Sequence, residues 1–203
     1  MKIECRNCSK ECYSGKRGLC NVCYSKDLKV KAKVKKAKAK AQKKIIDKRF
    51  NKSNLMKTAD TIFSLYIRLR DSDTEGNSLC CSSGKMCEWS SLDNGHYIPR
   101  GYMKYRYDER NCNAQSKNDN SRLHGNIPEY RRFIISKYGQ EVEQEMFMGS
   151  KELFKVDSSF FLNIIAKYVP VVLEQLSKKT FNVENYIINV ERIKRLYLDQ
   201  SIT

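Results

Sequence analysis

The chain has 203 residues, of which 40% are hydrophobic, with nine cysteines, two histidines and a formal net charge of +16. This length allows one sizeable core with an appendage, or two small domains. The first residues, MKIECRNC, lack the apolar core of a signal peptide, and no stretch approaches eighteen consecutive apolar residues, so neither a secretory signal nor a membrane span is predicted. We therefore expect a cytoplasmic protein without a membrane partner, whose cysteines bind metal rather than form disulfides.

Residues 1–25 are predicted to form a small zinc-knuckle module. Cys5 and Cys8 form one CxxC pair and Cys20 and Cys23 form another, with Cys12 between the pairs. Two such pairs match a four-cysteine zinc site, in which the metal replaces a core too small to fold by itself. Reduced cysteines in a loop are the alternative. Because a four-thiolate site has no open position, its Zn²⁺ would be structural, and the module would serve to position the segment that follows.

The next segment, residues 26–57, carries most of the charge. It contains fourteen Lys or Arg against two Asp, which is +12 of the total. Up to about residue 50 it has no Gly or Pro, so a long exposed helix is predicted, with a solvated linker as the alternative. Repulsion costs about 0.2–0.5 kcal/mol per i,i+4 lysine pair, so an anion should stabilise this helix. The lysines expected to contact DNA are Lys31, Lys35, Lys36, Lys38, Lys40, Lys43 and Lys44.

Residues 58–203 are predicted to form the main folded domain. Thr58 is the expected N-cap of its first helix, since apolar residues then recur with the 3.6-residue period of a helix face. These apolar positions are Ala59, Ile62, Phe63, Tyr66, Ile67 and Leu69. Residues 76–126 are rich in Gly, Ser, Asn and Cys, which predicts hairpins and loops.

Helices are expected to return after the hairpins. Pro128 should lie in the first turn of one helix and Gly139 at its end. A helix over residues 157–179 should be capped by Asp157 and kinked or split at Pro170, and a last helix should cover residues 183–199. The fold class predicted is α+β and mostly helical.

The region between Asp93 and Asn126 contains both histidines, His96 and His124. A histidine near the end of a strand, followed some fifteen residues later by an asparagine (here Asn111) and then by a helix, is the outline of a ββα-metal nuclease finger. In such a finger the imidazole takes a proton from water, and a divalent cation on Asp and Asn oxygens stabilises the leaving oxygen. A histidine hydrogen-bonded within a loop is the alternative.

Four segments of the chain resemble the phage recombination family NinG, also called Rap. They are SLYIRLRDSD, DNGHYIPRG, RYDERNCNAQ and LHGNIPEYRRFIISKYG, and the resemblance covers residues 58–145, with the cysteine module and basic helix ahead of it. The family is known for structure-specific endonucleases that act on branched DNA, such as Holliday junctions and D-loops, and is similar to HNH nucleases. The resemblance implies an HNH-like domain over residues 58–203 that uses Mg²⁺ or Mn²⁺, in a phage protein acting in the cytoplasm of its bacterial host. A homodimer would suit symmetric cutting.

The resemblance also implies roles for individual residues. His96 would be the general base, and Asp93 would bind the catalytic cation or orient this base. Asn111 would bind the cation or hold the histidine loop. His124 would be a further ligand of the cation. Phosphate contacts would come from Tyr97, from Arg100, and from Asn126 at the start of a helix, with a purely structural role as the alternative for Tyr97 and Arg100.

The sequence departs from the family at a second zinc site. The four cysteine positions of that site are occupied here by Cys80, Ser83, Ser116 and Asp119. Because serine hydroxyls are poor zinc ligands, we expect no zinc there, and hydrogen bonds among Ser83, Ser116 and Asp119 to replace it. A rebuilt site that uses Cys80 with some of Cys81, Cys87 and Cys112 is the alternative. A non-catalytic DNA-binding accessory protein with a degenerate finger therefore stays open as a second function.

Overall fold

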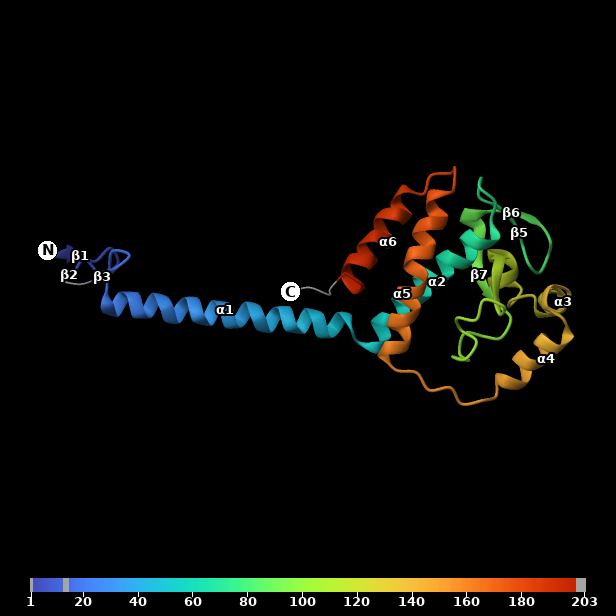
Figure 1. Ribbon diagram of the computed structural model, residues 1–203, viewed down its shortest axis with the longest axis horizontal. Coiled ribbons are helices and arrows are strands. Elements are labelled where there is room, and N and C mark those ends of the chain that lie inside the picture. The colour runs from blue at the N-terminus through green and yellow to red at the C-terminus, as the bar shows by residue number, and fades with distance from the viewer. Residues whose placement is uncertain (1, 13–14, 200–203) are drawn as a thin grey trace. The chain divides into compact units, whose positions relative to one another are not determined.

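The computed structural model describes residues 2–12 and 15–199 and divides into two compact units, Met1–Phe50 and Asn51–Thr203 (Figure 1). The second unit begins earlier than the expected boundary at Thr58. The reason is that Asn51 caps the helix, since its side chain accepts a hydrogen bond from the backbone N–H of Asn54 at 2.9 Å. Thr58 lies within the helix and donates to the Asn54 carbonyl.

The first unit consists of two short antiparallel hairpins and one long helix. Strand β1 (Ile3–Glu4) pairs with β2 (Glu11–Cys12), and β3 (Gly15–Lys16) pairs with β4 (Leu19–Cys20). Helix α1 (Asn21–Arg49) follows directly. The predicted basic helix is confirmed, and it begins before residue 26, within the cysteine module.

Three helices form the core of the second unit. Helix α2 (Lys52–Asp71) packs against α5 (Ser158–Ser177), and α5 packs against α6 (Glu184–Tyr197). The apolar face predicted for the first helix is buried in full. Asp157 caps α5 as predicted, accepting from the backbone N–H of Phe160, but Pro170 lies inside a continuous helix and does not split it.

Helix α5 is also long and apolar enough, by length and composition alone, to cross a membrane, although no span was expected. The core helix of a globular protein passes the same test. Its buried side chains include Phe161, Ile165 and Val172, and α5 packs along α2. These contacts explain its apolar composition without a membrane.

The predicted hairpins lie between the first helix and the later ones. Strand β5 (Asn77–Leu79) pairs with β6 (Met86–Glu88), and β7 (Leu92–His96) pairs with β8 (Cys112–Ser116). A π-helical turn, Asn118–Arg122, leads to the last two helices of this region, α3 (Ile127–Tyr138) and α4 (Gln140–Gly149). Pro128 and Gly139 lie at the start and the end of α3, as predicted.

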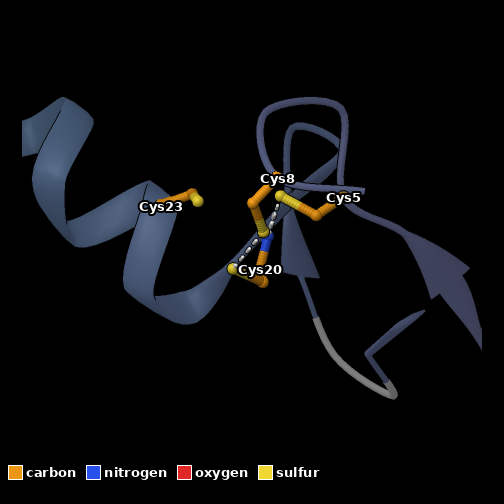
Figure 2. A group of neighbouring side chains, drawn as sticks. All are labelled: Cys5, Cys8, Cys20 and Cys23. Atoms are coloured by element: carbon orange, nitrogen blue, oxygen red, sulfur yellow. Dashed lines mark hydrogen bonds between the residues drawn. The ribbon is translucent and has the colours of Figure 1, made fainter. Parts of the chain in front are cut away.

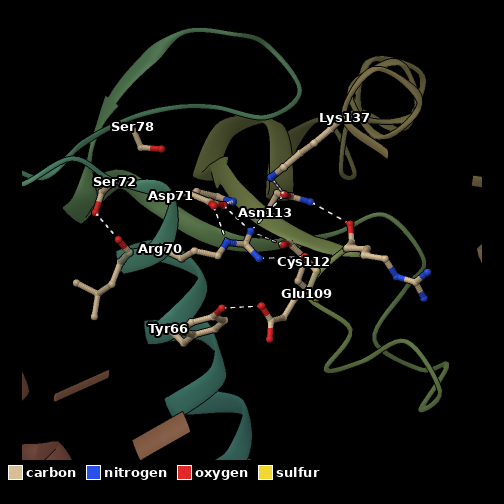
Figure 3. A network of polar contacts seen from close by, with 12 residues as sticks. Tyr66, Arg70, Asp71, Ser72, Ser78, Glu109, Cys112, Asn113 and Lys137 are labelled. Atoms are coloured by element: carbon tan, nitrogen blue, oxygen red, sulfur yellow. Dashed lines mark hydrogen bonds and ion pairs between the residues drawn. The ribbon is translucent and has the colours of Figure 1, made fainter. Parts of the chain in front are cut away.

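A buried network of polar contacts joins the end of α2 to β8 (Figure 3). The guanidinium of Arg70 donates to both carboxylate oxygens of Asp71, at 2.7 and 2.9 Å, and to the carbonyls of Glu109 and Cys112. Asp71 in turn accepts from the backbone N–H of Ala114 at 2.8 Å. Because two residues of α2 bond to the backbone on both sides of Asn113, the network holds β8, and with it β7, against the helical core.

Substituting Arg70 should therefore destabilise the second unit strongly. Arg70→Ala leaves Asp71 half-buried without its partner and two carbonyls without donors, which should cost about 3 kcal/mol or more. Arg132→Ala, which removes an exposed pair with Glu129, is the control and should cost less than about 1 kcal/mol. Urea unfolding followed by the fluorescence of the single tryptophan, Trp89, measures both values. Equal losses in the two variants would contradict this role of Arg70.

Candidate functional site

A pocket of about 260 Å³ opens between α2, β7 and the loop that follows β7. Its polar lining includes two carboxylates, one imidazole, two guanidinium groups and two amides, from Asp60, Asp93, His96, Arg100, Arg106, Asn94 and Asn120. The structure thus brings together three of the residues singled out in the sequence, Asp93, His96 and Arg100. Pairing of β7 with β8 places Asp93 opposite Gln115 and His96 opposite Cys112.

The glycine of the DNGH segment is required by this pairing. A Cβ at Gly95 would collide with the side chain of Gln115, which is itself fully buried. The Gln115 amide donates to Ser82 Oγ at 2.9 Å and to the carbonyl of Gly125 at 2.7 Å. Gly95 therefore allows the strand with His96 to lie close to a side chain that connects it to the start of α3.

The imidazole of His96 lies at the end of β7 between two carbonyl oxygens. Nε2 is 3.1 Å from the oxygen of Arg106, and Nδ1 is 3.3 Å from the oxygen of Asn94. Burial lowers the pKa of His96 to about 4, so the ring is neutral at pH 7. A neutral imidazole has one N–H and one lone pair, and the lone pair is what a general base needs.

Asp93 is half-buried on the wall of the same pocket. One of its oxygens, Oδ2, accepts from the amide of Asn120 at 2.9 Å. Within residues 2–12 and 15–199, no Lys or Arg forms an ion pair with Asp93. A pocket carboxylate that is not held in an ion pair is a suitable ligand for Mg²⁺ or Mn²⁺.

Asn111 does not line this pocket. Its side chain is fully buried, its Oδ1 accepts from the backbone N–H of Ile98 at 2.6 Å, and its Nδ2 donates to the carbonyls of Ile98 and Tyr105, both at 3.0 Å. Of the two roles expected for Asn111, the geometry fits holding the histidine loop. The cation-ligand role does not fit, because both ends of the amide are hydrogen-bonded to the loop backbone and Asn111 is outside the pocket lining.

Three other expected site residues also lie apart from the pocket lining. His124 is exposed, in a left-handed conformation with φ +49°, and Asn126 has φ +44° and makes no side-chain capping bond. Tyr97 is buried and donates to Glu143 at 2.6 Å, and burial together with this bond raises the pKa of Tyr97 to about 12. The tyrosine therefore packs in the core, and a phosphate contact does not fit it.

The pocket lining also includes two charged residues that the sequence did not single out, Asp60 and Arg106. Asp60 is a polar residue on the partly buried side of an amphipathic helix, and such a position is only weak evidence for a functional role. Arg106 contacts His96 through its main-chain carbonyl. Every residue has this group, so the residue type does not indicate the contact.

Residues at the second zinc site implied by the family resemblance lie close together, but they are joined by hydrogen bonds. Cys80 Sγ lies 3.1 Å from Asp119 Oδ2, Ser82 Oγ donates to the same oxygen at 2.9 Å, and the backbone N–H of Asp119 donates to Ser116 Oγ. Burial alone would raise the pKa of Asp119, but the side chains of Cys80, Ser83 and Ser82 lower it. The expected replacement by hydrogen bonds has its counterpart here, and Ser82 takes part in it although it was not predicted to.

The four N-terminal cysteines expected to bind zinc lie together (Figure 2). Their sulfur atoms all lie within 4.8 Å of one another, and Cys8 Sγ is 3.9 Å from Cys20 Sγ. Tetrahedral Zn²⁺ with Zn–S bonds of about 2.3 Å requires sulfur atoms about 3.8 Å apart, so the group fits the metal. The backbone N–H groups of Cys20 and Asn7 lower the pKa of Cys5 to about 6, which favours the thiolate that binds metal.

This cysteine group connects directly to the basic helix. Cys20 is the residue immediately before α1, and Cys23 lies in its first turn. A metal on these two thiolates would fix the start of the helix. All seven lysines expected to contact DNA are exposed on α1, and of these Lys31 pairs with Asp27.

These features define a mostly helical α+β protein in which a four-cysteine module and a basic helix precede a domain with a histidine-bearing hairpin. The family model described as Bacteriophage Lambda NinG protein matches residues 1–189, and the chain belongs to the NinG family. Protein ninG of Enterobacteria phage H19B is 33% identical over 96 residues, which are 47% of this chain and 45% of that protein. The match thus spans less than half of that relative. No solved structure matches the chain.

The purified protein should contain one zinc per chain, held by the N-terminal cysteines. Cys8→Ser and Cys20→Ser should each lose it, because a serine hydroxyl is a poor zinc ligand. Cys12→Ser is the matched control and should keep the metal, since Cys12 lies outside the group. The zinc content of each protein is measured by titrating the cysteines with a thiol reagent and detecting the released zinc with a colorimetric indicator. Two zinc ions per chain would contradict the hydrogen-bonded description of the second site.

The stability of the second unit should fall as the pH is lowered from about 6.5 to about 4. The pKa of His96 is lower in the folded state than the ordinary 6.5, so between these values the unfolded state binds more protons, and its free energy falls relative to that of the folded state. The full effect is up to about 3 kcal/mol. Urea unfolding between pH 4 and 7.5, followed by Trp89 fluorescence, should show this dependence in His124→Gln and lose it in His96→Gln. An unchanged dependence in His96→Gln would contradict the burial of the ring.

Proposed function

We propose that the chain is a metal-dependent, structure-specific DNA endonuclease of phage recombination that cleaves branched DNA, such as Holliday junctions and D-loops, in the host cytoplasm. The supporting observation is the environment of His96. Its ring is neutral at pH 7, is held by a backbone carbonyl, and shares a pocket with the unpaired carboxylate of Asp93. A neutral base next to a carboxylate is the combination required for cation-assisted hydrolysis of a phosphodiester.

The chemistry assigned to this chain's residues is a single proton transfer. His96 takes a proton from a water molecule, whose oxygen attacks the phosphorus of the scissile phosphodiester while the bond to the leaving oxygen breaks. Mg²⁺ or Mn²⁺, when bound, supplies positive charge for the leaving oxygen. Asp93 is the residue that fits a cation ligand, and Arg100, an exposed residue of the pocket lining, would contact a neighbouring phosphate.

The first unit would bind DNA without reading its sequence. Exposed lysines along α1 interact with phosphates, which fix the position of the protein but do not distinguish bases. The structural zinc would order the start of this helix through Cys20 and Cys23. Selection of branched DNA would then depend on its shape.

A second candidate is a non-catalytic DNA-binding accessory protein. It is favoured by one observation, that Asn111 and His124 do not line the pocket with Asp93 and His96. In that case the zinc module and α1 would carry the whole function, and the hairpin would be a scaffold. Both candidates predict DNA binding, and only the first predicts cleavage.

Cleavage of labelled four-way junction, D-loop and linear duplex, with and without Mg²⁺ or Mn²⁺, distinguishes the two candidates. The endonuclease should cut a branched substrate only with a cation. His96→Gln should lower the cleavage rate about 10²- to 10⁴-fold, the usual contribution of a general base, with unchanged DNA affinity. His124→Gln is the matched control and should keep cleavage, because His124 does not line the pocket. If neither cation supports cutting of any substrate, the enzyme proposal is wrong.

DNA affinity should fall steeply with salt. Contact with about six phosphates gives a slope of log affinity against log salt of roughly −5. Lys35→Gln with Lys38→Gln should make this slope less negative by roughly 2, because each phosphate contact contributes about 0.9. The control pair, Lys151→Gln with Lys178→Gln, removes exposed lysines of the second unit and should leave the slope unchanged. Fluorescence anisotropy at several salt concentrations measures it, and equal slopes in all proteins would exclude α1 as the DNA contact.

A further inference from the structure

Asp60, in the middle of α2, forms the most closely bonded ion pair of the pocket. Its Oδ1 accepts from Arg106 Nε at 2.8 Å and its Oδ2 accepts from Arg106 Nη2 at 2.5 Å. Oδ1 also accepts from the hydroxyl of Tyr107 at 2.9 Å. Both partners of the pair are largely buried, with side-chain exposures of 24% and 13%. A bidentate pair of this kind restricts the position and the orientation of the guanidinium.

The third nitrogen of the same guanidinium extends the contact across the loop. Arg106 Nη1 donates to the carbonyl of Arg100 at 2.7 Å, so one side chain connects α2 to two points of the loop between β7 and β8. Because three nitrogen atoms of its guanidinium donate hydrogen bonds, Arg106 is held firmly at its side chain, and this restricts the movement of its backbone. The carbonyl of this residue is the group that lies 3.1 Å from His96 Nε2.

The two carbonyl contacts of His96 require the ring proton on different nitrogen atoms. A neutral imidazole can donate from Nε2 to the Arg106 carbonyl or from Nδ1 to the Asn94 carbonyl, but not from both. The contact with Arg106 is the shorter one, and its acceptor is held in place from α2. Donation from Nε2 leaves the lone pair on Nδ1, where the nearest carbonyl oxygen is that of Asn94 at 3.3 Å, whereas donation from Nδ1 would direct the lone pair to the closer Arg106 carbonyl at 3.1 Å.

We infer that Asp60 is a positioning residue, which acts through Arg106 to hold His96 as the Nε2–H tautomer and so makes Nδ1 the proton acceptor. Within the described residues, Asp60 forms no hydrogen bond with His96, and its effect on the ring is transmitted by one ion pair and one carbonyl. This inference deepens the proposed function, since a fixed tautomer matters for catalysis only if His96 is the base. The tautomer itself is a property of the free protein and can be observed without any substrate.

The test uses the zinc-loaded full-length protein, labelled with ¹⁵N-histidine, without added Mg²⁺ or Mn²⁺ at pH 7.5. Long-range ¹H–¹⁵N correlation spectra distinguish the two neutral tautomers, and the chain has only two histidines, so the His96→Gln spectrum assigns the signals. The wild type should show His96 as Nε2–H alone. In Asp60→Asn, which keeps the shape but loses the charge, the Nδ1–H tautomer should appear as the Arg106 carbonyl is released and the Asn94 carbonyl becomes the better acceptor.

Two further variants make the result specific. Arg106→Lys keeps a charge but cannot form the bidentate pair, and it should show the same second tautomer. Asp108→Asn is the matched control, because Asp108 holds Arg110 in a similar ion pair of the same loop without contact to His96. It should keep the wild-type tautomer. Backbone amide spectra of each variant establish that the fold is retained.

The cleavage assay gives the second readout. Asp60→Asn should lower the cleavage rate about 10- to 100-fold with unchanged DNA affinity, as is usual for residues that orient a catalytic histidine. A folded Asp60→Asn protein that keeps His96 entirely as Nε2–H would overturn the inference, and so would an equal change in Asp108→Asn. If the tautomer changes as expected but the wild type cuts no DNA, the positioning role stands and the endonuclease proposal fails.

Discussion

The register between β7 and β8 is the constraint on which the candidate site depends. His96 is the last residue of β7 and pairs with Cys112, the first of β8, so everything from Tyr97 to Asn111 forms one connecting loop. The buried amide of Asn111 closes this loop by bonding both backbone groups of Ile98. A shift of one residue would turn His96 to the opposite face of the hairpin, because neighbouring side chains of a strand point to opposite sides. One buried asparagine therefore helps to fix the side on which the imidazole lies.

Contacts from distant parts of the chain maintain this register. Arg70 and Asp71 hold β8 from the end of α2, while Asp60, about three turns further back, bonds to Arg106 in the loop. The same helix therefore supports the strand and the loop that flank the pocket. The network of Cys80, Ser82 and Asp119 supports the opposite end, where Gln115 connects it to β8. Hydrogen bonds there occupy the place at which the family resemblance implies zinc, so local order would need no metal.

The sequence predicted the parts of the structure that depend on local pattern. The long lysine helix, the apolar face of α2, the cap at Asp157 and the ends of α3 follow from helix propensity, periodicity and capping chemistry within a few residues. Asn51 and Thr58 are both good capping residues, and local pattern alone did not distinguish them. Asp93 and His96, singled out by residue type, spacing and the family resemblance, line one pocket, and their catalytic roles stay predictions. Asp60 and Arg106 were missed because their pairing joins residues far apart in sequence and acts through a carbonyl. Asn111 and His124 were expected at the cation, but tertiary contacts direct one inward and leave the other exposed on a turn.

The central claim is that the imidazole of His96 lies beside a divalent cation held at Asp93. Paramagnetic broadening by Mn²⁺ tests it most directly, since the effect falls steeply with distance from the ion and the chain has only two histidines to observe. The account predicts that low Mn²⁺ broadens the ring signals of His96 before those of His124, and that Asp93→Asn abolishes the difference. Equal broadening of the two histidines, or selective broadening of His96 that persists in Asp93→Asn, would contradict it.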